Sequence, residues 1–132
     1  MATKTEIARQ YLAACDKGDF DEAYTFVSDD FIFTQGGTAQ LSNNYGYPDS
    51  GGKELQREFE TKLRETHSNL VTTIESITED GDKVHIKAAT QADYHIPATQ
   101  DAAAQTGSSN YPFTCVITFS GDKIKQSDSI TL

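Results

Sequence analysis

A few polar side chains fall on faces of this sequence that are otherwise apolar, and these residues could carry chemistry. Tyr11 lies on the apolar face of a predicted helix, and Gln35 ends an apolar strand. Gln126 and Asp128 share a strand face with Ile124. A phenol can donate a hydrogen bond to a substrate oxygen, and a carboxylate in an apolar site can move protons. Each residue alone is also compatible with a hydrogen-bonded core position, but together they predict a small-molecule pocket with convergent polar groups.

The sequence lacks the spacing signatures of metal, phosphate and nucleophile sites. The three histidines, His67, His85 and His95, form no helical i,i+4 pair and have no cysteine companion. His85 and His95 alternate with charged residues, which is typical of a solvated strand face. There is no glycine-rich phosphate loop, and no serine sits in a nucleophile elbow. We therefore expect a site with no metal and no cofactor.

Length and charge narrow the class of protein. The 132 residues predict a single domain, 1–132, with 36% hydrophobic residues to build a core. The net charge of −9 argues against nucleic acid and anionic membranes as partners. We find no apolar run of about 18 residues and no signal-peptide pattern. The two isolated cysteines, Cys15 and Cys115, favour a reduced compartment, so we expect a cytoplasmic protein.

The first third of the chain predicts two helices and a strand. The first helix spans Thr5–Lys17, and Gly18 suits its left-handed C-terminal cap. Its shared face carries Ile7, Tyr11, Ala14 and Cys15. A second helix is expected over Phe20–Val27, with a break at residues 28–30 and a strand over Phe31–Thr34.

A long polar loop, residues 36–52, separates this strand from a third predicted helix, Lys53–Thr66. Loops of this length in compact domains are often functional. Tyr45 and Tyr47 are the bulky groups near the loop's tip, so the loop reads either as a lid or as an ordinary surface segment. The apolar stripe of the third helix consists of Leu55, Phe59 and Leu63.

The remainder of the chain has the alternation of β-strands. The expected strands are Leu70–Thr78, Lys83–Ile96, Tyr111–Phe119 and Lys123–Leu132, with a small-residue loop over residues 97–110. Tyr94 falls on the apolar face of the second of these strands, and a β-bulge in the last strand would turn Asp128 away from the apolar face. Helices come first and an antiparallel meander follows, so we expect an α+β domain with helices packed on one face of a sheet.

Short motifs along the chain match a known superfamily. They are Arg9–Ala14, Lys17–Asp19, Ser28–Asp30, Gly52–Leu63 with its Arg-Glu-Phe triplet, and Phe119–Ile124. Through them the chain resembles the bacterial ketosteroid isomerases and, more broadly, the SnoaL-like members of the nuclear-transport-factor-2-like superfamily. The resemblance covers nearly the whole chain in element order. It implies a curved, mostly antiparallel sheet wrapped around three helices and enclosing a cone-shaped cavity.

The resemblance transfers only part of the isomerase machinery. In those enzymes an aspartate base moves a proton beside a carbonyl, and a tyrosine and a protonated aspartate stabilise the enolate. Tyr11 falls at the position of the tyrosine, whereas the base falls at Gln35 and the protonated aspartate near Cys115. Glu60 stands where the isomerases have another tyrosine. The chain is therefore not expected to be a ketosteroid isomerase in the strict sense.

SnoaL-like cyclases keep the cavity and change its polar groups, and several place an aspartate on the last strand. The resemblance thus implies a cofactor-independent isomerase, cyclase or dehydratase acting on an apolar, oxygenated small molecule, such as one from polyketide or terpenoid biosynthesis. Asp128 would transfer the proton and Tyr11 would donate to the substrate oxygen. The expected substrate-binding residues are Gln35, Gln126, Phe33, Phe59, Glu60, Tyr94, Tyr45 and Tyr47.

Two further expectations follow from the family. Its members often dimerise through the outer face of the sheet, so we expect a homodimer. The missing isomerase groups at Gln35 and Cys115 also leave open a non-catalytic ligand-binding or assembly module of the same fold.

Overall fold

The computed structural model describes residues 3–37 and 50–132. The helices are α1 (Lys4–Lys17), α2 (Phe20–Ala23), the 3-10 turn η1 (Tyr24–Phe26) and α4 (Lys53–Leu63). The strands are β1 (Val27–Gly37), β2 (Ser50–Gly51), β3 (His67–Asp80), β4 (Lys83–Ile96), β5 (Gln105–Ser120) and β6 (Lys123–Thr131). Tyr45 and Tyr47, the tyrosines of the expected lid, lie outside the described residues.

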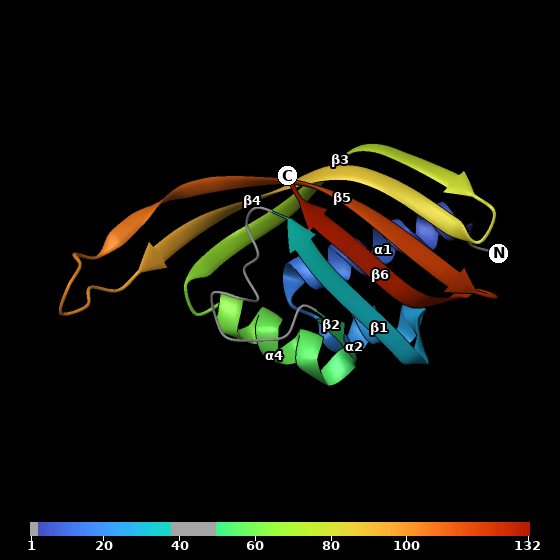
Figure 1. Ribbon diagram of the computed structural model, residues 1–132, viewed down its shortest axis with the longest axis horizontal. Coiled ribbons are helices and arrows are strands. Elements are labelled where there is room, and N and C mark those ends of the chain that lie inside the picture. The colour runs from blue at the N-terminus through green and yellow to red at the C-terminus, as the bar shows by residue number, and fades with distance from the viewer. Residues whose placement is uncertain (1–2, 38–49) are drawn as a thin grey trace.

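The strands form one curved, mixed sheet in the order β2-β1-β6-β5-β4-β3. The strands from β3 to β6 form the antiparallel meander that the sequence predicts, and β1 adds to β6 in parallel. Figure 1 shows the sheet curving around the helices, which lie on one side of it. The predicted α+β architecture, with a mostly antiparallel sheet wrapped around three α-helices, is confirmed for the described part of the chain.

The first helix begins and ends as its sequence predicts. The Thr3 hydroxyl accepts from the Glu6 amide at 3.2 Å and caps the start of α1. Gly18 has a φ of 73° at the C-terminal cap, a conformation that favours glycine. The carboxylate of Asp19 then accepts from the Glu22 amide at 3.1 Å, so α2 begins immediately. The short connection fixes the angle between these two helices.

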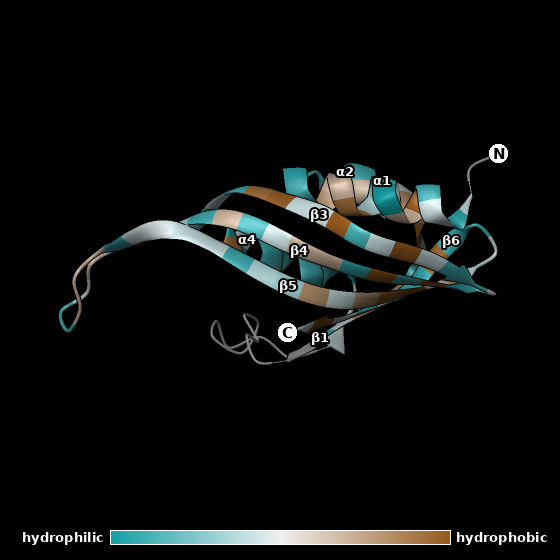
Figure 2. Ribbon diagram, turned by 90° about the horizontal axis from the view of Figure 1, so that it is seen from above, coloured by the Kyte–Doolittle hydropathy of each residue, from teal (hydrophilic) through white to brown (hydrophobic). Residues whose placement is uncertain are grey.

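Burial follows the alternation of the strands and the stripe of α1. Figure 2 shows hydrophobic and hydrophilic residues alternating along β3 and β5. The inward residues of the sheet and the helix stripe form a single core, with Tyr11 and Phe31 in edge contact at 6.1 Å between ring centroids. At about 25 cal/mol for each Å² of buried apolar surface, such aromatic contacts are a main source of stability.

Several predicted boundaries are wrong. Residues 28–30, expected to be a break, belong to β1, and the second helix ends at Ala23 before the 3-10 turn η1. Residues 105–110, expected to be loop, belong to β5 and pair with residues 91–96 of β4. Small residues hide the alternation there, and the Tyr94 ring covers Gly107, where a Cβ would lie 2.7 Å from the Tyr94 hydroxyl. In Figure 1 this β4–β5 hairpin projects from the body as an arm.

A bulge in β6 changes which of its side chains face the helices. Phe119 pairs with Ile124, but Thr118 pairs with Gln126, so Lys125 is an extra residue in the ladder. Because side chains alternate along a strand, the insertion moves Ser127 and Ser129 to the inner face and Asp128 to the outer one. The prediction that Asp128 and Gln126 share the face of Ile124 is therefore wrong.

Arg64, the residue after α4, joins that helix to α1. Its guanidinium hydrogen-bonds the Glu60 carboxylate at 2.8 Å and the Cys15 and Asp16 carbonyls at the end of α1. The Cys15 carbonyl also accepts from the Gly18 amide at 2.9 Å, and the negative end of the helix dipole favours a cation beside these carbonyls. The guanidinium also lies 5.6 Å from the centre of the Phe20 ring. A single side chain thus positions α4 against α1 and α2.

We expect Arg64→Met to lower the free energy of unfolding by about 3–5 kcal/mol, because it leaves the Glu60 carboxylate buried without its cation. Urea unfolding at neutral pH measures the loss. In the double variant Arg64→Met/Glu60→Gln the uncompensated charge is gone, so part of the stability should return.

Arg57→Met is the matched control. Arg57 pairs with Asp21 at 3.2 Å, but both side chains are more than half exposed. Such a surface pair contributes at most about 1 kcal/mol. If Arg64→Met costs no more than Arg57→Met, Arg64 does not link the helices as described.

Candidate functional site

A cavity lies between α1, α4 and the inner face of the sheet. Its apolar walls come from both layers: Leu12, Phe33, Phe59, Leu63, Leu70, Ala92 and Phe113. Its polar lining consists of Tyr11, Cys15, Asp16, Thr34, Gln35, Gln56, Glu60, Arg64, His67, Thr72, Thr90, Tyr111, Ser127, Ser129 and Thr131. Polar residues outnumber apolar ones in this lining, but most of its exposed surface belongs to apolar atoms, as is typical of a small-molecule site.

Tyr11 and Gln56 meet across the helix layer. Tyr11 is 2% exposed, and the Gln56 side-chain amide donates to its hydroxyl at 2.8 Å. The Tyr11 hydroxyl also hydrogen-bonds the Cys15 thiol, and burial raises the pKa of Tyr11 well above its ordinary value. The other amide atom of Gln56, Oε1, is buried and has no partner among the described residues. Tyr11 therefore stays protonated, and Gln56 keeps one polar atom available to a ligand.

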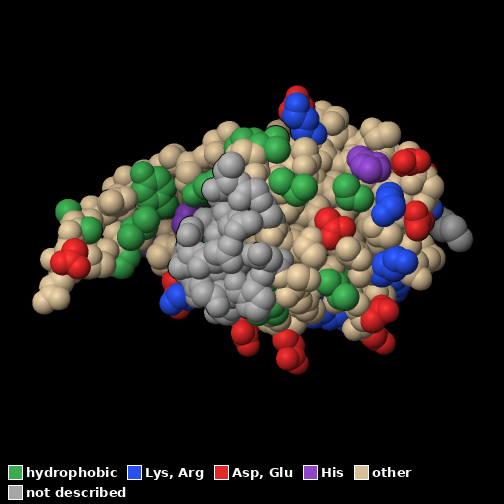
Figure 3. All heavy atoms as spheres, in the orientation of Figure 1, with side chains coloured by type: hydrophobic (Ala, Val, Ile, Leu, Met, Phe, Trp, Pro, Cys, Tyr) green, Lys and Arg blue, Asp and Glu red, His purple; other side chains and the backbone are tan. Residues whose placement is uncertain are grey.

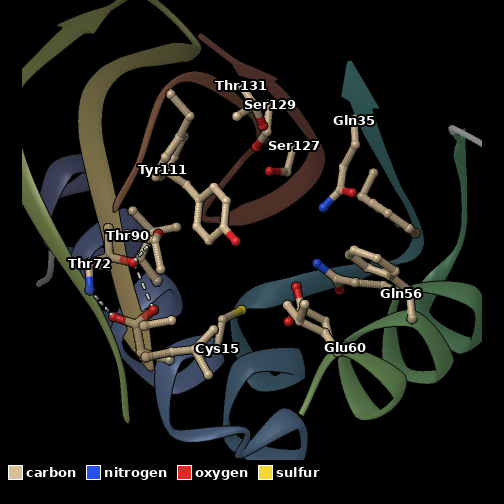
Figure 4. A pocket seen from close by; sticks show the side chains of 18 of the residues that line it. Cys15, Gln35, Gln56, Glu60, Thr72, Thr90, Tyr111, Ser127, Ser129 and Thr131 are labelled. Atoms are coloured by element: carbon tan, nitrogen blue, oxygen red, sulfur yellow. Dashed lines mark hydrogen bonds between the residues drawn. The ribbon is translucent and has the colours of Figure 1, made fainter. Parts of the chain in front are cut away.

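Glu60 brings a carboxylate to the cavity from α4. Its side chain is 17% exposed, and Oε2 accepts from Arg64 at 2.8 Å. Oε1 makes no hydrogen bond with residues 3–37 or 50–132, and Figure 4 shows the carboxyl group facing the cavity. Burial raises the pKa of Glu60, Arg64 opposes this effect, and the nearby Asp16 adds to it. Such a carboxylate can take a proton more readily than an ordinary glutamate.

A second carboxylate, Asp16, is tied to the sheet. Its oxygens accept from the backbone amide and the hydroxyl of Thr72, each at 2.7 Å. The Thr72 hydroxyl on β3 also lies 2.9 Å from the Thr90 hydroxyl on β4, so the hydrogen bonds from Asp16 continue across the two strands. Burial raises the pKa of Asp16, and the two bonds from Thr72 oppose that rise. Because both oxygens are occupied, Asp16 orients the cavity wall and Glu60 is the freer base.

The Cys15 thiol also faces the cavity, between Glu60 and the sheet side (Figure 4). Burial, with the nearby Glu60 carboxylate, raises the pKa of Cys15 far above that of an ordinary thiol. A thiol held in its protonated form is a poor nucleophile. Cys115 lies behind the cavity lining, 3.6 Å from the Ser127 hydroxyl, and burial raises the pKa of its thiol too. We find no sign of an activated cysteine.

The strand side of the cavity carries neutral polar groups. Gln35 enters from β1, and Ser127, Ser129 and Thr131 form a row along the inner face of β6 (Figure 4). Tyr111 enters from β5, and its hydroxyl lies 3.4 Å from Nε2 of the buried His67. The His67 ring is 6.3 Å from the Tyr111 ring and 6.5 Å from the Tyr94 ring.

The structure brings together some of the expected site residues and separates others. Those that line the cavity are Tyr11, Gln35, Phe33, Phe59 and Glu60. Those that do not are Asp128, Gln126 and Tyr94. The Asp128 carboxylate instead accepts from the Thr34 hydroxyl at 2.6 Å and from the Gln126 amide at 3.0 Å. The bulge at Lys125 is the physical reason, since it places both residues on the outer face of β6.

Sequence reasoning missed Gln56, His67 and the serines of β6. Gln56 and His67 continue the apolar stripe of α4, because positions 56, 59, 63 and 67 follow the helical spacing. That stripe could have identified them, although His67 already lies in β3. Nothing in the sequence marks the extra residue in β6, so the serine row could be found only from the strand register.

The described ranges, 3–37 and 50–132, contain neither a metal-binding cluster nor a membrane-spanning helix. No group of three or more His, Cys, Asp and Glu is placed to hold a metal ion. None of the helices in these ranges is long and apolar enough to cross a membrane. On the face drawn in Figure 3, basic side chains lie among acidic ones and form no separate basic patch.

Comparison with solved structures finds the same fold at low sequence identity. IdmH from Streptomyces antibioticus, a candidate polyketide cyclase, has a TM-score of 0.79 at 13% identity over 98% of this chain and 92% of its own. A candidate SnoaL-like polyketide cyclase from Shewanella putrefaciens gives 0.77 at 13% identity over 99% and 90%. A ketosteroid isomerase-like protein from Catenulispora acidiphila, in complex with trimethylamine, gives 0.68 at 18% identity over 96% and 85%.

Comparison with curated proteins finds no match. The profile of the SnoaL-like domain matches residues 8–127, which include all of the helices and strands that frame the cavity except the first residues of α1 and the last of β6. The expected resemblance is thereby confirmed, and the chain belongs to the SnoaL-like domain family.

Proposed function

We propose that this protein is a cofactor-independent enzyme of the isomerase or cyclase type, which uses acid–base chemistry on an apolar, oxygenated small molecule. The observation that carries the proposal is Glu60, a cavity-lining carboxylate with a raised pKa, one oxygen of which makes no hydrogen bond within residues 3–37 and 50–132. The names of the structural relatives IdmH and the Shewanella protein, both candidate polyketide cyclases, support this class of reaction.

In the proposed reaction Glu60 acts as the base. Oε1 of Glu60 takes a proton from a carbon next to a substrate carbonyl, and the electron pair of the broken C–H bond moves to the carbonyl oxygen. Tyr11 donates its hydrogen bond to the developing oxyanion, and the bond from Gln56 strengthens that donor. Return of the proton from Glu60 to another carbon gives isomerisation. Attack of the enolate carbon on a second carbonyl, whose oxygen then takes the proton from Glu60, gives cyclisation.

The remaining lining supports a neutral substrate. Arg64 is already bound to Glu60 and to the α1 carbonyls, so it offers no free cation to an anionic ligand. Phe33 and Phe59 supply flat apolar walls, and the side-chain amides of Gln35 and Gln56 can orient substrate oxygens. We assign proton transfer, which the sequence analysis expected of Asp128, to Glu60, since Asp128 does not line the cavity.

Hydrogen–deuterium exchange tests the chemistry without the natural substrate. In D₂O the protein should catalyse exchange of the hydrogens next to the carbonyl of bicyclic aryl ketones such as 1-tetralone. Proton NMR measures the rate of this exchange. Glu60→Gln should slow exchange by about 10²-fold or more, because an amide cannot accept the proton. Tyr11→Phe should slow it by roughly 10²–10³, the usual cost of losing an oxyanion donor.

Asp128→Asn is the matched control for Glu60→Gln. It also exchanges a carboxylate for an amide, but on the outer face of the sheet, so exchange should stay near the wild-type rate. A slow Asp128→Asn variant beside a normal Glu60→Gln variant would contradict the assignment. Ketone binding with no exchange above buffer would favour a non-catalytic binding module.

The pH dependence should report the raised pKa of Glu60. The base form exists above that pKa, so the exchange rate should rise with pH and level off, with its midpoint above the ordinary value of 4.5. The linked effect on folding has the opposite sign. Because the folded pKa is raised, the contribution of Glu60 to stability is present below its unfolded pKa and lost as pH rises through the folded one. A midpoint at or below 4.5 would contradict a buried base.

We also propose a homodimer formed through the outer face of the sheet. Three large apolar side chains are exposed on that face: Val71 (55%), Ile130 (52%) and Ile32 (45%). Light scattering should give twice the chain mass of 14.5 kDa. Ile130→Lys should dissociate the dimer, whereas Ile96→Lys, at an exposed position on the arm, should not. A single-chain mass for the wild type would refute the dimer.

A further inference from the structure

The pair formed by His67 and Tyr111 is not used in the proposed reaction. His67 begins β3 directly after α4 and is 7% exposed, and Tyr111 comes from β5. Both line the cavity, and Figure 4 shows the Tyr111 hydroxyl pointing toward its interior. A buried histidine joined to a phenol at a ligand cavity calls for an account of where each proton lies.

The neighbours of Nδ1 fix the tautomer of His67. Nδ1 lies 3.3 Å from the carbonyl oxygen of Leu63, which can only accept a hydrogen bond. It also lies 2.9 Å from the Thr66 hydroxyl, which itself lies 3.3 Å from the Leu63 carbonyl and donates to it. The Leu63 carbonyl therefore favours a proton on Nδ1, and the Thr66 hydroxyl can accept from that proton. In the neutral imidazole Nε2 then has a lone pair and no proton.

This tautomer determines the direction of the next hydrogen bond. Nε2 can only accept, so the Tyr111 hydroxyl must donate to it across their 3.4 Å separation. With its single proton committed to His67, the Tyr111 oxygen presents only lone pairs to the cavity. Polarisation along the chain from Leu63 through His67 to Tyr111 strengthens that oxygen as an acceptor.

We propose that His67 and Tyr111 form a receptor for a hydroxyl group of the ligand, phenolic or enolic, which donates to the Tyr111 oxygen. The inference rests on the proposed function, in that it takes the cavity as the substrate site. Oε1 of Glu60 and Oε1 of Gln56 are two further acceptors at the cavity without a hydrogen-bond partner among the described residues. The preferred ligand is thus a hydroxylated ketone or phenol rather than a simple ketone.

Binding of a matched pair of probes tests the receptor. In 1-methoxynaphthalene a methyl group replaces the hydroxyl proton of 1-naphthol, so only 1-naphthol can donate a hydrogen bond. Calorimetry on the full chain gives both affinities. The wild type should prefer 1-naphthol by roughly 3- to 10-fold, the usual net effect of one hydrogen bond. Tyr111→Phe should abolish this preference. Tyr94→Phe, which removes a hydroxyl from the same ring cluster but outside the cavity lining, should keep it.

The tautomer of His67 gives a readout that does not depend on a ligand. At about pH 8, where an ordinary histidine is neutral, the nitrogen-15 NMR shifts of His67 should show a proton on Nδ1 and a lone pair on Nε2. The other tautomer would overturn the proposal, because Tyr111 would then receive a proton from His67 rather than give one.

The possible outcomes separate this inference from the proposed function. Equal affinity for the two probes, or a preference that survives in Tyr111→Phe, would overturn the receptor while leaving the Glu60 chemistry intact. Deuterium exchange that fails in a protein with a Tyr111-dependent preference for 1-naphthol would overturn the enzyme and leave the receptor. If neither probe nor ketone binds, both are wrong.

Discussion

The contact on which the rest of the structure depends is the guanidinium of Arg64. It holds the Glu60 carboxylate and the carbonyls of Cys15 and Asp16 at the end of α1. Gly18 leaves it room, because a Cβ there would lie 3.0 Å from Arg64 Nε. The positive charge of Arg64 thus joins α1 and α4, the two helices that line the cavity. Burying that charge has a desolvation cost, which only several good hydrogen bonds offset.

The same contact bears on the proposed role of Glu60 as a base. Arg64 occupies one carboxylate oxygen and keeps the charged form accessible, while the apolar cavity disfavours it. The two effects act on the pKa of Glu60 in opposite directions, and the effect of burial is the larger, so this pKa is raised. Helix packing and proton affinity are therefore set by the same pair of side chains.

Sequence patterns were enough to predict the elements that depend on regular periodicity. The stripe of α1, the cap at Gly18 and the full extent of β4 were predicted because each follows a simple spacing or a turn residue. What failed depends on single irregularities. One extra residue at Lys125 reverses the faces of β6 and removes Asp128 from the cavity. No local preference marks a bulge, because its position is set by how neighbouring strands pair.

The fold tolerates changes in the polar residues of the cavity because the cavity has walls from two layers, the helices and the sheet. The position that resembles the isomerase base is Gln35, on the sheet, and it cannot accept a proton at neutral pH. The available carboxylate, Glu60, comes from α4 on the opposite side. A ligand held between these layers would lose its proton toward the helices, while Gln35 and the β6 hydroxyls bind it from the sheet. Under the proposed function, the same enclosure would transfer a proton on a different face of the substrate, so that changes in a few lining residues alter the reaction without altering the fold.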